Sequence, residues 1–466
     1  MKRFLQFHFI AALMVMLLIN TVSAQEDPKE KGIRKKISID KLVPLLSPVS
    51  DYSGEFSERT TISGDWGGVR QKKLYNGGFT LDVALTQTIQ GGAAGGNPTT
   101  GDYYGLLDYA ITLDTGRLGW WSGGFFVFDG QTNFGSTDLL SDAGSLSPVN
   151  MLMIYPFAPT SNSFLMEYYL LQGLSEKMIL MFGRLNATNI LDKNIFANQP
   201  RTQFLNAALN NDILILSVIN LSTYGVVLFN QISKSFGLAL AYFDANAKPG
   251  EFGVPGGIFQ KWGIALDVGV SWNHKEGLYG GLDVVGIYTN KDPADLENPT
   301  FVKDAIKDAL GEAPLPTANG NWLINVTFNQ YLWKPGKDSP QSKYKVPHTF
   351  SYEFNQRGLG LFARVGYLPA DRNIFSQFYS LGFGGCGIFK NRPYDRIGLG
   401  WYMVKKSKDA DKLPVNLIDN ENGFEFFYTF AFTPSIQLAG DFQYIRPFNN
   451  SIENSYVGGA RLLLQF

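Results

Sequence analysis

The chain has few of the residues that bind metals or form disulfides. Of its 466 residues only one is cysteine, Cys386, and three are histidine. One cysteine cannot form an intrachain disulfide, and two of the histidines, His274 and His348, are too far apart in sequence to suggest a zinc motif. The charge is balanced, with 40 Lys and Arg against 41 Asp and Glu, which gives no indication of a nucleic-acid partner. We therefore expect no metal, no cofactor and no nucleic acid.

Long hydrophobic runs are also missing from most of the chain. After residue 24 no run of 18 apolar residues occurs, which excludes membrane-spanning helices. The first 24 residues instead predict an export signal. Lys2 and Arg3 precede an apolar run at 9–19, and small residues at 22–24 form a cleavage site. We expect cleavage after Ala24 and a mature protein outside the cytoplasm.

The chain is rich in aromatic residues, at 14%, and in glycine, with 50 residues. Both suit strands joined by tight turns. A mean hydropathy of −0.06 suits a wall whose residues alternate between lipid and water. From Gly78 onward the two-residue period of strands recurs to the end of the chain. We predict sixteen strands, at 78–89, 104–114, 123–129, 164–172, 177–185, 225–231, 236–244, 262–273, 278–288, 321–331, 359–366, 378–384, 396–404, 423–432, 435–444 and 455–466.

The connections between these strands alternate between short and long along most of the chain, with 332–358 as a long exception among the short ones. That alternation is typical of outer-membrane barrels, whose short turns face the periplasm. We therefore predict an all-β fold, an antiparallel transmembrane barrel of about sixteen strands with a short N-terminal helix at 65–76. The weakly alternating stretch 348–354 is assigned to a connection.

Two strands show the expected outer face. In 262–273 every even position is apolar, and in 423–432 the even positions are all Phe or Tyr. The last strand also alternates and ends on Phe466, with Arg461 and Gln465 on its other face. Such a strand is typical of the final strand of an outer-membrane barrel, because closure leaves no backbone edge in lipid. We expect contact with outer-membrane lipid and recognition of Phe466 by the barrel assembly machinery.

The chain divides into three parts. Residues 1–24 are the signal peptide, 25–62 a charged periplasmic lead segment, and 63–466 the barrel domain. The connection 186–224 is long and rich in apolar residues, so it is expected to fold into the barrel and narrow it, although an external lid is the alternative.

Four stretches resemble the carbohydrate-selective (OprB-like) porins. They are SGDWGGVR at 63–70, GRLN at 183–186 with FLNAAL at 204–209, RGLGLFARVGY at 357–367 with DRN at 371–373 and DRIGLG at 395–400, and DFQYIRP at 441–447 after Thr433-Pro434. They occur in the order typical of the family. The resemblance implies a sixteen-stranded barrel of the Gram-negative outer membrane through which mono- and oligosaccharides diffuse passively into the periplasm.

Three functions compete. The first is the sugar porin. The second is a general channel or a channel for hydrophobic compounds, and the third is an outer-membrane barrel enzyme. No G-x-S-x-G or H-E-x-x-H motif occurs, and G-x-G-x-x-G at 382–387 lies in a strand without a βαβ unit, so we expect no enzyme. Carbohydrate solutes are the expected partners. The sugar, the ion selectivity and the choice between a monomer and a homo-oligomer are left open.

A sugar path requires hydrogen-bonding groups inside the barrel. Alternation along the strands suggests that eight charged residues face inward, including Asp267 and Asp283. The candidate path-lining residues are Asp82, Asp108, Glu167, Arg184, Arg201, Arg364 and Arg461. Arginine is favoured because its guanidinium offers several fixed donors to hydroxyl groups and stacks on flat faces. The alternative for each residue is an ion pair without a selective role.

Overall fold

The computed structural model describes residues 52, 54–94, 101–136, 143–154, 162–247, 257–273, 277–297, 307–308, 316–336, 357–410 and 418–466. Two short helical segments come first, the 3-10 turn η2 (Trp66–Gly68) and the π-helical η3 (Val69–Tyr75). They lie within the stretch 65–76 that the sequence predicts to be helical. No helix within the described part of the chain has the length and apolarity needed to cross a membrane.

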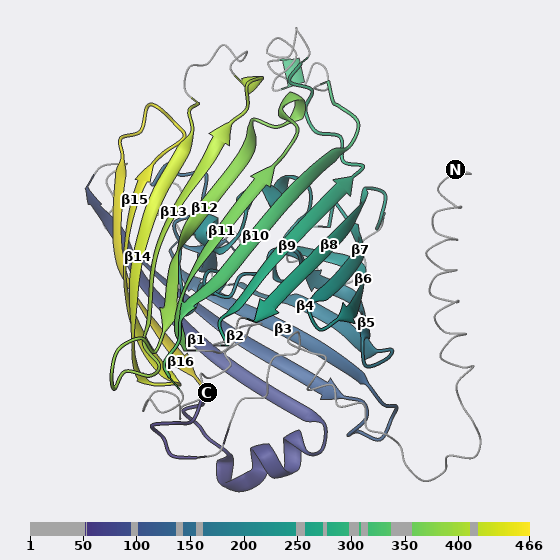
Figure 1. Cartoon of the computed structure of the whole chain (residues 1–466), viewed down its shortest axis with the longest axis vertical. Helices are drawn as coiled ribbons and strands as arrows, with labels where there is room; N and C mark the ends of the chain where they lie inside the picture. The colour runs from purple at the N-terminus through teal and green to yellow at the C-terminus, as the bar shows by residue number, and fades with distance from the viewer. Residues whose placement is uncertain are drawn as a thin grey trace, which may run out of the picture.

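The described residues form sixteen strands, which pair with their sequence neighbours and close into a barrel (Figure 1). The strands are β1 (Phe79–Ala94), β2 (Asp102–Asp114), β3 (Gly124–Gly135), β4 (Asn162–Gly173), β5 (Met178–Asn186), β6 (Ser222–Ser233), β7 (Phe236–Asp244), β8 (Trp262–Asn273), β9 (Tyr279–Thr289), β10 (Asn321–Trp333), β11 (Gly358–Tyr367), β12 (Phe375–Cys386), β13 (Arg396–Lys406), β14 (Glu421–Thr433), β15 (Ile436–Arg446) and β16 (Ser455–Gln465). All sixteen predicted strands are confirmed. The largest differences are at the ends of β1 and β3, which run several residues further than predicted. The stretch 348–354, the signal peptide and most of the lead segment lie outside the described residues.

The two faces of the wall differ as alternation predicts. In β14 the side chains of Phe424, Phe426, Phe430 and Phe432 are exposed on the outer face, whereas Phe427 is buried on the inner face. Each strand pairs with a neighbour on both sides, so the barrel has no unpaired strand edge, which is the condition for crossing lipid. The exposed aromatic stripe is therefore a lipid-facing surface.

The strands β1 and β16 pair directly along the seam, and the N-terminal segment, residues 54–78 with Tyr52, binds at its end. The backbone amide of Phe466 donates to Val83 of β1 at 2.8 Å, and the amide of Ile62 donates to Gln465 at 2.7 Å. Arg70 is buried and donates to the backbone oxygens of Leu81 at 2.5 Å and Phe466 at 3.0 Å. Figure 1 shows η3, in purple, at the same end of the barrel as the C-terminus. One arginine thus joins the first strand to the last.

Candidate functional site

The barrel interior is occupied by the inward loop, residues 187–221, which joins β5 to β6. It holds three short helical turns, α3 (Ala187–Leu191), α4 (Ala207–Asn210) and η5 (Ile213–Ser217). Each turn begins with a side-chain cap, from Asn186, Asn206 and Asp212 in that order. Such caps satisfy backbone amides that a turn leaves unpaired. The polar residues noted in the sequence therefore shape the loop, and the prediction of an inward-folded loop is confirmed.

The inward loop packs against strands that carry glycine on their inner face. The ring of Phe196 lies so close to Gly360 that a Cβ at that glycine would come within 2.0 Å of it. The Phe204 ring meets Phe362 and Phe427 edge-on, with ring centroids 5.6 and 4.9 Å apart. Apolar burial of this kind is worth roughly 25 cal/mol per Å2. It anchors the loop to β11–β14 and makes an external lid untenable.

Two wall carboxylates hold loop backbone directly. Glu425 accepts hydrogen bonds from the amides of Leu205 at 2.5 Å and Asn206 at 2.8 Å. Glu421 accepts from the amide of Ser147 at 2.9 Å, so the connection between β3 and β4 also folds into the barrel. Neither glutamate was among the candidates. The sequence pattern could have identified them, because both glutamates occupy inward positions of β14, which alternate with its outward phenylalanines.

Residues 192–201 of the inward loop, the crossing segment, run from one side of the wall to the other. At its first end Asp192 accepts from the Nε of Arg364 on β11 at 2.8 Å, and both side chains are fully buried. The Nζ of Lys193 lies 3.9 Å from a carboxylate oxygen of Asp267 on β8. Arg364 also donates to the backbone oxygen of Leu209 at 2.9 Å. This end of the segment is fixed to β8 and β11.

The second end of the crossing segment meets the opposite part of the wall. The Nη1 of Arg461 on β16 donates to the backbone oxygen of Pro200 at 2.6 Å. The Nε of Arg201 donates to Asp108 on β2 at 2.8 Å, and its Nη2 donates to the other oxygen of the same carboxylate. A forked contact of this kind fixes both position and orientation. The segment therefore spans the lumen between charged anchors.

Partly exposed acids lie beside this second anchor. Asp129 of β3 and Glu167 of β4 are directly opposite each other in the strand register and share the inner face. Both are half-buried. Asp283 of β9, which is half-buried as well, lies near Lys193 at the first anchor instead. Asp129 was missed from the sequence, although it occupies an inward position of a predicted strand. Together with Arg201 these side chains present both signs of charge to the lumen.

Asp82 faces inward at the end of the barrel that holds the C-terminus. Its Oδ1 accepts from the hydroxyl of Tyr52 at 2.9 Å and lies 3.5 Å from the guanidinium of Arg70. Asp82 is therefore engaged with the N-terminal segment.

Arg184 lies on the outer face of the wall, which corrects the expectation that it points inside. Leu185 and Met181 of β5 are part of the interior core, whereas Phe182 is 60% exposed on the other face. Arg184 shares the face of Phe182 and pairs in register with Tyr168 and Tyr224.

The guanidinium of Arg184 is covered by neighbouring side chains at this outer position. Its Nε donates to the hydroxyl of Ser222 at 2.6 Å, and the hydroxyls of Tyr168 and Tyr224 meet at 2.5 Å beside it. Alternation along the predicted strand had suggested a lumen position. The structure instead places position 184 on the same face as the exposed Phe182, opposite the buried Met181 and Leu185.

A closed barrel with an aromatic outer face, charged lumen groups and a loop across the lumen defines an outer-membrane porin. The model of the carbohydrate-selective porin family, OprB, matches residues 99–466, so the chain belongs to that family. It is a family of channels of the Gram-negative outer membrane rather than of catalysts. The search of curated proteins gave no match.

Two solved structures share the fold. The high-pH structure of Pseudomonas putida OprB is 21% identical, with a TM-score of 0.74, and the match covers 89% of this chain and 100% of that one. The low-pH structure of the same protein is 17% identical, with a TM-score of 0.53, over 88% of this chain and 99% of that one.

Proposed function

We propose that this porin lets mono- and oligosaccharides diffuse passively through its barrel into the periplasm. The crossing segment is the observation that carries the proposal, because it narrows the lumen with groups that hydrogen-bond to sugars. Weak, multiple contacts suit a channel that must release its solute. The family to which the chain belongs is named for carbohydrate selectivity, which supports the same solute class.

Within this proposal Glu167 and Arg201 line the sugar path, and Asp108, whose side chain is fully buried, holds Arg201 in position. Arg201 keeps its side chain 13% exposed while it holds Asp108, so it can offer a donor to a passing hydroxyl. The other inward candidates, Asp82, Arg364 and Arg461, contribute by holding the segments that shape the path. The surrounding lipid and the assembly machinery are the proposed partners of the outer face and of Phe466.

Purified channels in a planar bilayer test this function. Wild-type channels should conduct, and sugars added on one side should block the current. Arg201→Gln should weaken block by glucose roughly tenfold, because a charge-assisted hydrogen bond is lost. Arg201→Lys keeps the charge but loses the fork, so it should retain ion selectivity while block weakens.

Arg446→Gln is the matched control, since its side chain is 54% exposed at the end of β15. It should leave sugar block unchanged. Conducting wild-type channels that no sugar blocks would overturn the proposed function.

A further inference from the structure

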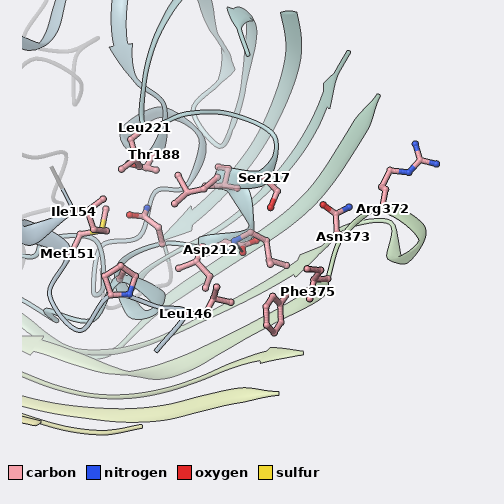
Figure 2. A pocket seen from close by; sticks show the side chains of 18 of the residues that line it. Leu146, Met151, Ile154, Thr188, Asp212, Ser217, Leu221, Arg372, Asn373 and Phe375 are labelled. Atoms are coloured by element: carbon pink, nitrogen blue, oxygen red, sulfur yellow. Dashed lines mark hydrogen bonds between the residues drawn. The ribbon is translucent and has the colours of Figure 1, made fainter. Parts of the chain in front are cut away.

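A cavity of about 480 Å3 lies at the end of the barrel away from the C-terminus. It is enclosed by the inward loop, by residues 146–154 of the β3–β4 connection, by residues 294–296 and by residues 372–375 before β12. Figure 2 shows Met151 and Ile154 on one side, Asn373 and Phe375 on the other, and Leu146 and Ser217 between them. The cavity size is within the range of small-molecule sites, roughly 300–1,000 Å3.

The lining of this cavity is mostly apolar, in contrast with the charged groups around the crossing segment. Its inner wall rests on a buried cluster that includes Ile154, Ala207 and Leu221. Two lining side chains stay open to solvent, Leu216 at 39% and Ile374 at 37% exposure. Bare apolar side chains that line a concave site are a mark of ligand binding.

The charged groups of the cavity already have partners within the protein. The guanidinium of Arg372 points away from the cavity in Figure 2 and donates through Nε to Asp371 at 3.0 Å. This hydrogen bond holds the pKa of the Asp371 carboxyl below its ordinary value, so the pair stays ionised at neutral pH. The carboxylate of Asp212 accepts from the amide of Leu214 at 2.9 Å. An uncharged solute suits this site better than an anion.

We propose that this cavity is an entry subsite for neutral glycosides with an apolar aglycone, such as aryl glucosides. The aglycone ring contacts Leu216 and Ile374, the two exposed apolar side chains of the lining, while the sugar keeps its hydroxyl groups in the solvent at the mouth of the cavity. The inference rests on the proposed sugar-porin function and adds a substrate class to it. It follows that the channel distinguishes two glycosides that differ only in the aglycone.

Current block in a planar bilayer by methyl β-D-glucoside and phenyl β-D-glucoside is the direct test. The two probes carry the same sugar, so any difference comes from the ring. Wild-type channels should be blocked by the phenyl glucoside at a concentration at least about tenfold lower, since apolar pockets discriminate by this order for a few added carbons.

Two variants remove the subsite in different ways. Ile374→Asn makes an exposed apolar contact polar, and Ser217→Phe fills the cavity from an exposed position. Both should reduce the phenyl preference to about threefold or less, with methyl glucoside block and conductance unchanged. Ile232→Asn is the matched control, because Ile232 is 44% exposed at the opposite end of the barrel. It should keep the wild-type preference.

The outcomes separate the two proposals. If wild-type channels respond equally to both glycosides, or if Ile374→Asn and Ser217→Phe keep the preference, the subsite is wrong and the sugar porin stands. If conducting wild-type channels are blocked by neither glycoside nor by glucose, the proposed function itself fails.

Discussion

Arg364 and Arg184 are both fully buried arginines, but they lie on opposite faces of the same wall. Arg364 points into the barrel, where it pairs with Asp192 and donates to backbone oxygens of the inward loop. Arg184 points outward and is covered by Tyr224, whose ring centroid lies 5.1 Å from its guanidinium carbon. A charged group facing lipid costs a barrel about 2–4 kcal/mol at the midplane and about 0–1 kcal/mol near the interfaces. Arg184 lies two residues from the end of β5, and the tyrosine cover reduces its contact with lipid further. Arg364 therefore stabilises the inward loop, whereas Arg184 stabilises the contact between neighbouring strands of the wall.

Substitution of Arg364 should release the inward loop without unfolding the barrel. Arg364→Leu leaves the buried carboxylate of Asp192 without its ion pair, a loss worth about 3–5 kcal/mol. The strand hydrogen bonds do not depend on this side chain, so folded protein should still migrate as a heat-modifiable band. Single channels should show larger and noisier conductance, because the loop no longer narrows the lumen in one position.

The control for Arg364→Leu is Arg446→Leu, which breaks an exposed pair with Asp419. Exposed pairs are worth about 0–1 kcal/mol. A quiet, wild-type conductance in Arg364→Leu would contradict the anchoring role.

At the scale of elements, the N-terminal segment binds both strands of the seam between β1 and β16, and we call this contact the clasp. Arg70 lies between the rings of Tyr52 and Trp66, with its guanidinium carbon 4.0 and 4.9 Å from their centroids, and reaches both end strands. A barrel has only one junction between its first and last strands, and that junction forms last along the chain. A helical turn that binds both sides of it stabilises closure after synthesis is complete.

Arg70→Gln should lower the temperature at which the folded band converts to the unfolded band on a gel. The loss of its hydrogen bonds to two backbone oxygens is worth about 2–5 kcal/mol in total.

Deletion of Phe466 should act at an earlier stage, during assembly, and reduce the amount of folded protein in the outer membrane, since that residue is the proposed assembly signal.

The two defects are separable by measuring yield and melting temperature in the same samples. Arg446→Gln, whose side chain is 54% exposed at the end of β15, should change neither. A normal melting temperature for Arg70→Gln would rule out the clasp.

At the scale of the whole molecule, the connections sort by length to the two ends of the barrel. Within the described residues, the turns at 174–177, 234–235 and 434–435 lie at the end that holds the C-terminus, and the inward loop enters from the other end. Short turns belong to the periplasmic side of such barrels. This predicts that the cavity between the loops opens to the outside of the cell, where a solute first arrives.

Cysteine labelling on intact cells tests this orientation in a Cys386→Ser background. A membrane-impermeant maleimide should modify Glu297→Cys and Lys408→Cys, both exposed in long connections, and should spare Lys234→Cys in a short turn. Permeabilised cells should label all three positions, which shows that each cysteine is reactive. The reverse pattern on intact cells would show that the barrel has the opposite orientation in the membrane.

The sequence by itself determined the class of the fold. Sixteen strands, the outer aromatic face of β14 and the inward loop all followed from the two-residue period and from apolar content, because lipid on one side and water on the other impose alternation along every strand. Glu421 and Glu425 were also within reach of that rule. Only the tertiary structure decided what each inward charge holds. Arg201 meets Asp108 and Arg364 meets Asp192 across more than 90 residues of chain, and no local pattern encodes a contact between a loop and a distant strand. The structure also placed Arg184 outside, since its partners, Tyr168 and Tyr224, lie on neighbouring strands whose register is set by the closed barrel.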